Sequence, residues 1–112
     1  MPLPTPLSPE LAEALADRFR LLAEPTRLRL LDLMSGGERS VGELAEAIGC
    51  TTANVSKHLA LMADAGIVVR RRSGLHSYYA VADTAVFELC GQVCESLRRV
   101  ADARAAALRD TA

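Results

Sequence analysis

Apolar residues recur at helical spacing in the first part of the chain and predict two helices before residue 36. The first is expected to begin at Ser8-Pro9-Glu10, where a serine cap precedes a proline and an acidic residue, and to stop before Pro25. Its apolar residues are Leu11, Leu15, Phe19 and Leu22. A dense apolar run over 28–34 predicts a second, largely buried helix that opens at Pro25 and ends at Gly36-Gly37.

Two short amphipathic helices follow, joined by a tight turn over 48–51. Ser40 and Glu43 have the spacing of a capping box at the start of the third helix, which Gly49 terminates. The fourth helix is expected over 52–65, with Thr51 or Thr52 as its cap. Its inward residues are Val55, Leu59, Met62 and Ala65. Two short helices joined in this way follow the helix-turn-helix plan.

From Ile67 onward the pattern becomes that of strands and then of one long helix. The runs 67–71 and 77–81 predict a two-stranded hairpin with Ser73-Gly74 as its turn. Asp83 then caps a final helix from Thr84 to about Arg109. The expected fold is mainly α with a two-stranded β-wing, a winged helix-turn-helix. Four prolines within residues 1–9 predict a mobile tail, followed by a single domain over 10–110.

Composition narrows the class of protein. The chain has 112 residues, a net charge of −1 and three cysteines, which fits one domain with a single core. No apolar run is long enough to span a membrane and no secretory pattern opens the chain, so we expect a cytoplasmic protein with free thiols. Two histidines, no glycine-rich phosphate loop and no nucleophile beside a base argue against an enzyme. A protein-interaction module built on the last helix is the alternative from another class.

The fourth helix and the hairpin carry groups that suit nucleic acid. The outward side chains of the helix are hydroxyl, amide, ammonium and imidazole groups, which can contact base edges and phosphates in the major groove of DNA. A solvated polar face explains the helix alone equally well. The hairpin changes this balance, because Arg70, Arg71, Arg72 and His76 give it a basic surface for the DNA backbone or minor groove.

Three segments of the chain resemble the ArsR/SmtB family of bacterial transcriptional repressors, with a match over about residues 10–100. The segments are LLAEPTRLRLL at 21–31, VSKHLALM at 55–62 and AGIV at 65–68. The resemblance implies a homodimer, joined through the first and last helices, that binds a palindromic double-stranded operator and releases it when an inducer is sensed. It implies DNA contacts from the recognition helix at Thr51, Thr52, Asn54, Ser56, Lys57 and His58, with the wing arginines as further candidates. His58 has a second interpretation, in which it packs beneath the helix or supports a phosphate contact.

The sensory residues of the family are only partly present. A zinc site on the last helix would need histidines after Asp83, and the chain has Ala85 and Ser96 where they are expected. Asp83 is then better explained as a helix cap. The cysteine pair that many arsenic-sensing members carry before the turn is missing from 40–44. The remaining thiols are Cys50, Cys90 and Cys94.

Cys90 and Cys94 are four residues apart on the last helix, which places their Cβ atoms about 6 Å from each other. Repeated across a two-fold axis, the pair would give four thiolates suited to As(III), Cd(II), Cu(I), Pb(II) or Zn(II). Two alternatives remain open: oxidation or persulfide bridging of the same thiols, or plain packing in a dimer seam with no metal site. Cys50, in the turn, is a less favoured ligand and is more readily explained by packing.

Overall fold

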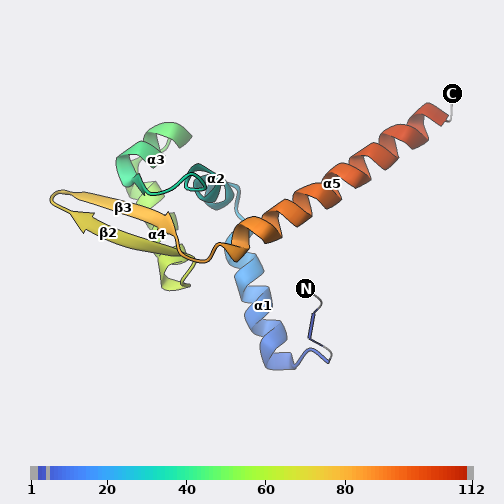
Figure 1. Ribbon diagram of the computed structural model, residues 1–112, viewed down its shortest axis with the longest axis horizontal. Coiled ribbons are helices and arrows are strands. Elements are labelled where there is room, and N and C mark those ends of the chain that lie inside the picture. The colour runs from blue at the N-terminus through green and yellow to red at the C-terminus, as the bar shows by residue number, and fades with distance from the viewer. Residues whose placement is uncertain (1–2, 5, 111–112) are drawn as a thin grey trace. The chain divides into compact units, whose positions relative to one another are not determined.

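The computed structural model describes residues 3–4 and 6–110 (Figure 1). In chain order its elements are α1 (Pro9–Leu22), α2 (Pro25–Leu33), β1 (Arg39–Ser40), α3 (Val41–Ile48), α4 (Thr52–Asp64), β2 (Val68–Ser73), β3 (His76–Val81) and α5 (Ala85–Asp110). The predicted winged helix-turn-helix is confirmed. Contacts divide the chain into two units, one ending at Ala82 and the other beginning at Asp83. Residues 1, 2 and 5 of the predicted mobile tail lie outside the described residues, and the tail and single domain stay predictions.

The helices begin at the caps that the sequence predicts. The Ser8 hydroxyl accepts a hydrogen bond from a first-turn amide of α1 at 3.1 Å. Ser40 and Glu43 form both halves of the capping box, with distances of 3.1 and 2.9 Å. The sequence left open which of two adjacent threonines caps α4. In the structure Thr51 is the cap and Thr52 is the first helical residue. The sequence predicts these helix starts because each cap joins a side chain to a backbone amide within one helical turn.

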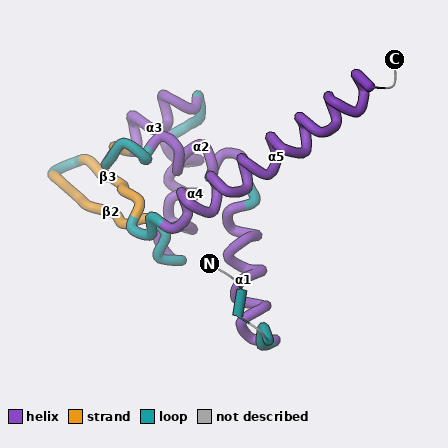
Figure 2. Tube along the Cα trace, turned by 45° about the vertical axis from the view of Figure 1, so that its right-hand side comes forward, coloured by secondary structure: helices purple, strands orange, loops and turns teal. Residues whose placement is uncertain are grey.

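The sheet has one strand more than the predicted hairpin. Arg39 of the short strand β1 pairs with Tyr79 of β3, so the strand order is β1-β3-β2. The hairpin is also longer than expected: Ser73 pairs with His76, and the turn is Gly74-Leu75 instead of Ser73-Gly74. Gly74 has φ of +61°, a conformation that two-residue hairpin turns require and glycine adopts easily. Figure 2 shows the hairpin tip reaching beyond the helices of its own unit.

The core of the first unit is apolar and is formed by α2, α3, α4 and the residues that enter β2. Its most deeply buried large side chains are Leu30, Leu44, Val55, Leu59, Met62 and Ile67, each at most 1% exposed. Burying one such side chain contributes about 1.5–3 kcal/mol. Because three of them belong to α4, one face of that helix is fixed against the core and the opposite face is left in solvent.

The second unit is the long helix α5, which spans 26 residues. Asp83 Oδ1 accepts a hydrogen bond from the Ala85 amide at 3.1 Å, as expected of a residue that caps this helix. Three apolar residues spaced four and three apart lie on one side of it and are 50, 64 and 47% exposed: Val93, Leu97 and Val100. Among the described helices, none has the length and apolar character needed to cross a membrane.

Candidate nucleic-acid interface

The turn between α3 and α4 is held by a left-handed glycine. Gly49 has φ of +82°, and its amide and that of Cys50 donate to the same carbonyl oxygen, of Ala45, at 2.9 and 3.1 Å. The chain therefore turns sharply after α3, and Thr51 caps α4 two residues later. The Cys50 side chain is half-buried in this turn.

The N-terminal half of α4 presents polar side chains to solvent. Thr51, Thr52, Asn54, Ser56 and Lys57 are all exposed. The Thr51 hydroxyl also accepts from the Asn54 amide at 3.1 Å, which fixes the first turn. Val55, Leu59 and Met62 form the buried side of the helix, and the five polar side chains lie outside it, in solvent. The structure thus brings together five of the six candidates predicted on this helix.

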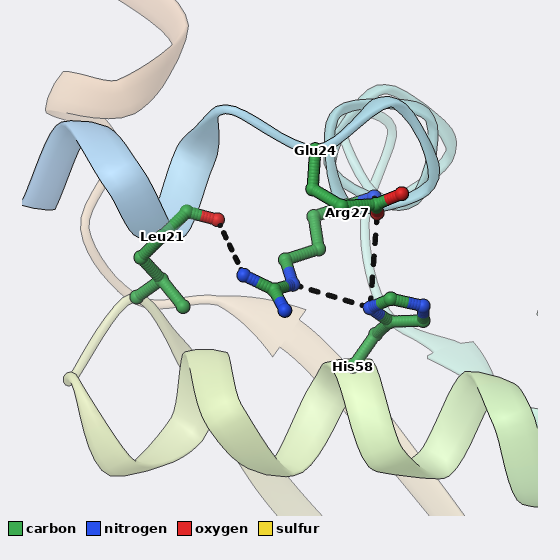
Figure 3. A network of polar contacts seen from close by, with 4 residues as sticks. All are labelled: Leu21, Glu24, Arg27 and His58. Atoms are coloured by element: carbon green, nitrogen blue, oxygen red, sulfur yellow. Dashed lines mark hydrogen bonds and ion pairs between the residues drawn. The ribbon is translucent and has the colours of Figure 1, made fainter.

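His58, the sixth candidate, lies against α2 (Figure 3). Its side chain is only 16% exposed. The imidazole Nδ1 accepts a hydrogen bond from Nε of Arg27 at 3.1 Å and is 3.8 Å from Oε2 of Glu24. The packing interpretation of His58 therefore has partners in the structure, and a DNA contact by His58 stays a prediction.

The three arginines of the wing do not share one face. Alternate residues of a strand point to opposite faces, so Arg70 and Arg72 lie on one face of β2 and Arg71 on the other. Arg70 donates from Nη2 to the Ser77 hydroxyl at 3.2 Å. The guanidinium carbon of Arg71 lies 4.7 Å from the ring centroid of Tyr78, a cation–π contact with its cross-strand neighbour. All three arginine side chains are exposed.

Arg71 is also held by an acidic residue. Its Nε and Nη2 donate to the two carboxylate oxygens of Glu38 at 2.9 and 2.7 Å, a bidentate pair. The hydrogen bond from Arg71 lowers the pKa of Glu38, and the same bond raises the pKa of Arg71. On the same face, His76 is exposed and its ring meets Tyr78 edge-on, with 6.3 Å between centroids. The positive charge of Arg71 is therefore offset by Glu38, a residue outside the hairpin.

The cysteines stand as free thiols in different surroundings. Cys90 is half-buried and Cys94 is exposed, both on α5. Burial, and secondarily the neighbouring Cys94, raises the pKa of the Cys90 thiol. Within the described part of the chain, no group of three or more His, Cys, Asp or Glu side chains could hold a metal ion.

Sequence reasoning identified none of Glu24, Arg27 and Glu38 as site residues. Glu24 and Arg27 belong to the segment that carries the family resemblance. A glutamate followed by a proline is the local pattern from which a helix cap at Glu24 could have been predicted. Glu24 indeed caps α2, its Oε2 accepting from the Arg27 amide at 3.0 Å. Nothing near Glu38 in the sequence points to its partner, because Arg71 is 33 residues away.

Known helix-turn-helix proteins are similar to this chain in sequence. A family model described as a helix-turn-helix domain matches residues 22–71. The HTH-type transcriptional regulator Rv0081 of Mycobacterium tuberculosis, described as uncharacterized, is 38% identical over 96 residues, which cover 85% of this chain and 84% of the relative. A transcriptional repressor SmtB homolog of Synechocystis is 34% identical over 95 residues, covering 85% and 72%.

Solved structures are similar over the same span. The crystal structure of Rv0081 has a TM-score of 0.78 at 36% identity and covers 87% of this chain and 98% of that one. The homodimeric winged helix-turn-helix domain Mb0332 of Mycobacterium bovis, a possible ArsR-family regulator, has a TM-score of 0.68 at 34% identity, covering 83% and 82%. The antimony-specific transcriptional repressor AntR has a TM-score of 0.77 at 28% identity, covering 87% and 88%.

Proposed function

Since the chain belongs to the ArsR/SmtB family of winged helix-turn-helix transcriptional regulators, which are DNA-binding proteins and not enzymes, we propose that it represses transcription as a homodimer on a palindromic operator. The observation that carries the proposal is that α4 has one buried side and one polar, exposed side. One side of the helix is anchored by side chains that are 0% exposed, and the other presents a row of polar groups to solvent. A recognition helix needs both properties to place donors and acceptors at base edges.

In this proposal the residues of α4 and the wing have different tasks. Thr51, Thr52, Asn54 and Ser56 offer short side chains that can reach bases or phosphates, and Lys57 offers a point charge for the backbone. Arg70 and Arg72 contact phosphates from the wing, with His76 beside the hairpin turn. Arg71, engaged by Glu38 and Tyr78, chiefly holds the strands together.

Dimerisation is assigned to the first and last helices. On α1, Leu11 and Phe19 are 45 and 46% exposed; on α5, the side that carries Leu97 is apolar and exposed. Large apolar side chains gathered on an exposed helical face suit burial against another subunit. The Mb0332 domain, similar over most of this chain, is homodimeric, which supports dimerisation.

The inducer is proposed to act at Cys90 and Cys94. Two subunits would bring four thiols to the dimer axis, a donor set for As(III), Cd(II), Cu(I), Pb(II) or Zn(II). The antimony-specific repressor among the similar structures supports a metalloid or soft metal as the class of effector. Ligation would change the angle between the two recognition helices and release the operator. Thiol oxidation or persulfide bridging at the same pair is the competing mechanism.

The experiment that tests DNA binding begins with a random pool of DNA duplexes. The protein should select a sequence with two-fold symmetry, and a gel shift with that duplex should weaken steeply as salt is raised. A scrambled duplex of the same composition is the control. Selection of no sequence above the scrambled control would contradict the proposed function.

A further inference from the structure

Arg27 connects three helices of the first unit through its side chain. Its Nη1 donates to the carbonyl oxygen of Leu21 at 2.9 Å, and its Nε donates to Nδ1 of His58 at 3.1 Å. Leu21 belongs to the last turn of α1, Arg27 to the first turn of α2, and His58 to the middle of α4 (Figure 3). One planar guanidinium thus fixes the end of α1 relative to the centre of α4.

The Leu21 end of this connection is a backbone group that needs a partner. The last carbonyl oxygens of a helix receive no hydrogen bond from within the helix. Arg27 supplies the missing donor for the carbonyl oxygen of Leu21 in α1. The arginine is itself oriented by Glu24, whose carboxylate accepts from the Arg27 backbone amide at 3.0 Å. The same carboxylate oxygen lies 3.8 Å from Nδ1 of His58. The contact between Arg27 and His58 is therefore part of a fixed group of side chains at the start of α2.

This contact also determines where the proton of His58 resides. A guanidinium Nε–H can only donate, so Nδ1 of His58 must be the acceptor. A neutral imidazole has one accepting nitrogen and one N–H, which leaves the proton on Nε2. In its neutral form, His58 is thus held in a single tautomer with one N–H donor, on Nε2.

We propose that Arg27 is a positioning residue for operator recognition that acts through His58. It holds α4 in the place where the short side chains of its exposed face meet base edges. Base contacts depend on this placement more than phosphate contacts do, because the latter come from long, adaptable lysine and arginine side chains. The inference rests on the proposed function, and it identifies a residue outside the DNA-facing surface that sets specificity.

The first test compares Arg27→Gln with Arg29→Gln, which removes the same charge from an exposed position of the same helix. Affinity is measured for the selected operator duplex and for the scrambled duplex. Arg27→Gln should lower affinity for the operator about tenfold, as the loss of one good base contact does, and leave affinity for scrambled DNA unchanged. Arg29→Gln should leave the ratio of the two affinities as in the parent. If Arg27→Gln had the same ratio of operator affinity to scrambled-duplex affinity as the parent, the proposal would be overturned.

A second pair of variants separates positioning from direct contact by His58. The amide oxygen of asparagine can take the place of Nδ1 and accept from Arg27, whereas glutamine reaches the position of Nε2. His58→Asn should therefore retain more operator preference than His58→Gln. Equal losses, or better retention by His58→Gln, would contradict the positioning role.

A spectroscopic measurement on the parent protein needs no variant of the network. The chain has two histidines, so the ¹⁵N signals of His58 can be assigned by their persistence in His76→Gln. At neutral pH the shifts should show Nε2 protonated and Nδ1 accepting a hydrogen bond. A proton on Nδ1 would overturn the inference. Failure of the proposed function is distinct from this, since it would appear as a parent protein that selects no DNA sequence.

Discussion

Glu38 and Arg71 are 33 residues apart in the sequence, yet their side chains are joined by two hydrogen bonds of 2.7 and 2.9 Å. Glu38 directly precedes β1, and Arg71 lies in β2. Because β3 runs between these strands, the ion pair crosses over it, with the Tyr78 ring 4.7 Å from the guanidinium carbon. Two of the five N–H donors of Arg71 are therefore engaged by Glu38.

Different wing arginines should accordingly make different contributions to DNA binding. Replacing Arg72, or Arg70, with Gln should reduce the slope of log K against log salt by about 0.9, the value for one lost phosphate contact. Arg71→Gln should leave that slope unchanged, because its charge is offset by Glu38. Gel shifts over a salt series measure the slopes. If Arg71→Gln instead reduced the slope by as much as Arg70→Gln or Arg72→Gln, Arg71 would have to leave Glu38 to contact DNA.

The same ion pair should be visible in an acid titration. Because the folded pKa of Glu38 is lowered, its contribution to stability is present above the unfolded pKa and is lost as pH falls through the folded pKa. Carboxyl NMR should show Glu38 titrating below the ordinary glutamate range, and returning to that range in Arg71→Gln. The difference in stability between the parent and Glu38→Gln should shrink over the same acidic window. An unshifted Glu38 in the parent would contradict the pairing.

Lys57 and Ser56 should affect recognition in different ways. Lys57→Ala should weaken binding to operator and scrambled duplexes alike and lower the salt slope, since a lysine contact to phosphate carries no sequence information. Ser56→Ala should weaken operator binding selectively, and the double variant should abolish the gel shift. Both positions are exposed, so the melting temperature should hardly change. A double variant that still binds operator as the parent does would exclude this face of α4 from the interface.

Soft metal binding should depend on the two helical cysteines and on pH. Cys90→Ser and Cys94→Ser should each abolish release of the operator by Cd(II) or As(III), whereas Cys50→Ser, the matched control in the turn, should respond as the parent does. Ligation requires thiolates, so Cd(II) affinity should rise with pH. Because burial raises the pKa of Cys90, that rise should continue above the ordinary thiol range. Release that persists in both serine variants would remove the pair from the sensory role.

A charge on the apolar side of α5 should separate the subunits. Leu97 is 64% exposed within one chain, and Leu97→Glu would place a carboxylate in the proposed interface, where burial of an unpaired charge is costly. Sedimentation equilibrium should detect monomers, with loss of operator binding. Asp102→Arg, a charge change away from this side of the helix, is the control and should stay dimeric. A dimeric Leu97→Glu protein would place the interface elsewhere.

The sequence by itself determined the succession of helices and the position of the helix-turn-helix. Caps such as Ser40 with Glu43, and the left-handed Gly49, act within one helical turn, so their patterns are complete in a short stretch of chain. The spacing of Val55, Leu59 and Met62 likewise identified the buried side of α4, and with it the polar side that faces solvent. A winged helix-turn-helix with a basic hairpin followed from such local evidence.

Only the tertiary structure decided which polar side chains already have partners. His58 meets Arg27, 31 residues earlier, because α2 packs on α4. Arg71 meets Glu38 because β1 joins the far edge of β3, a two-residue pairing too short to leave a pattern in the sequence. From the sequence alone, the three arginines of the wing and the histidine of the recognition helix are all predicted to contact DNA. Long-range packing divides such residues into those that face solvent and those that hold the molecule in shape.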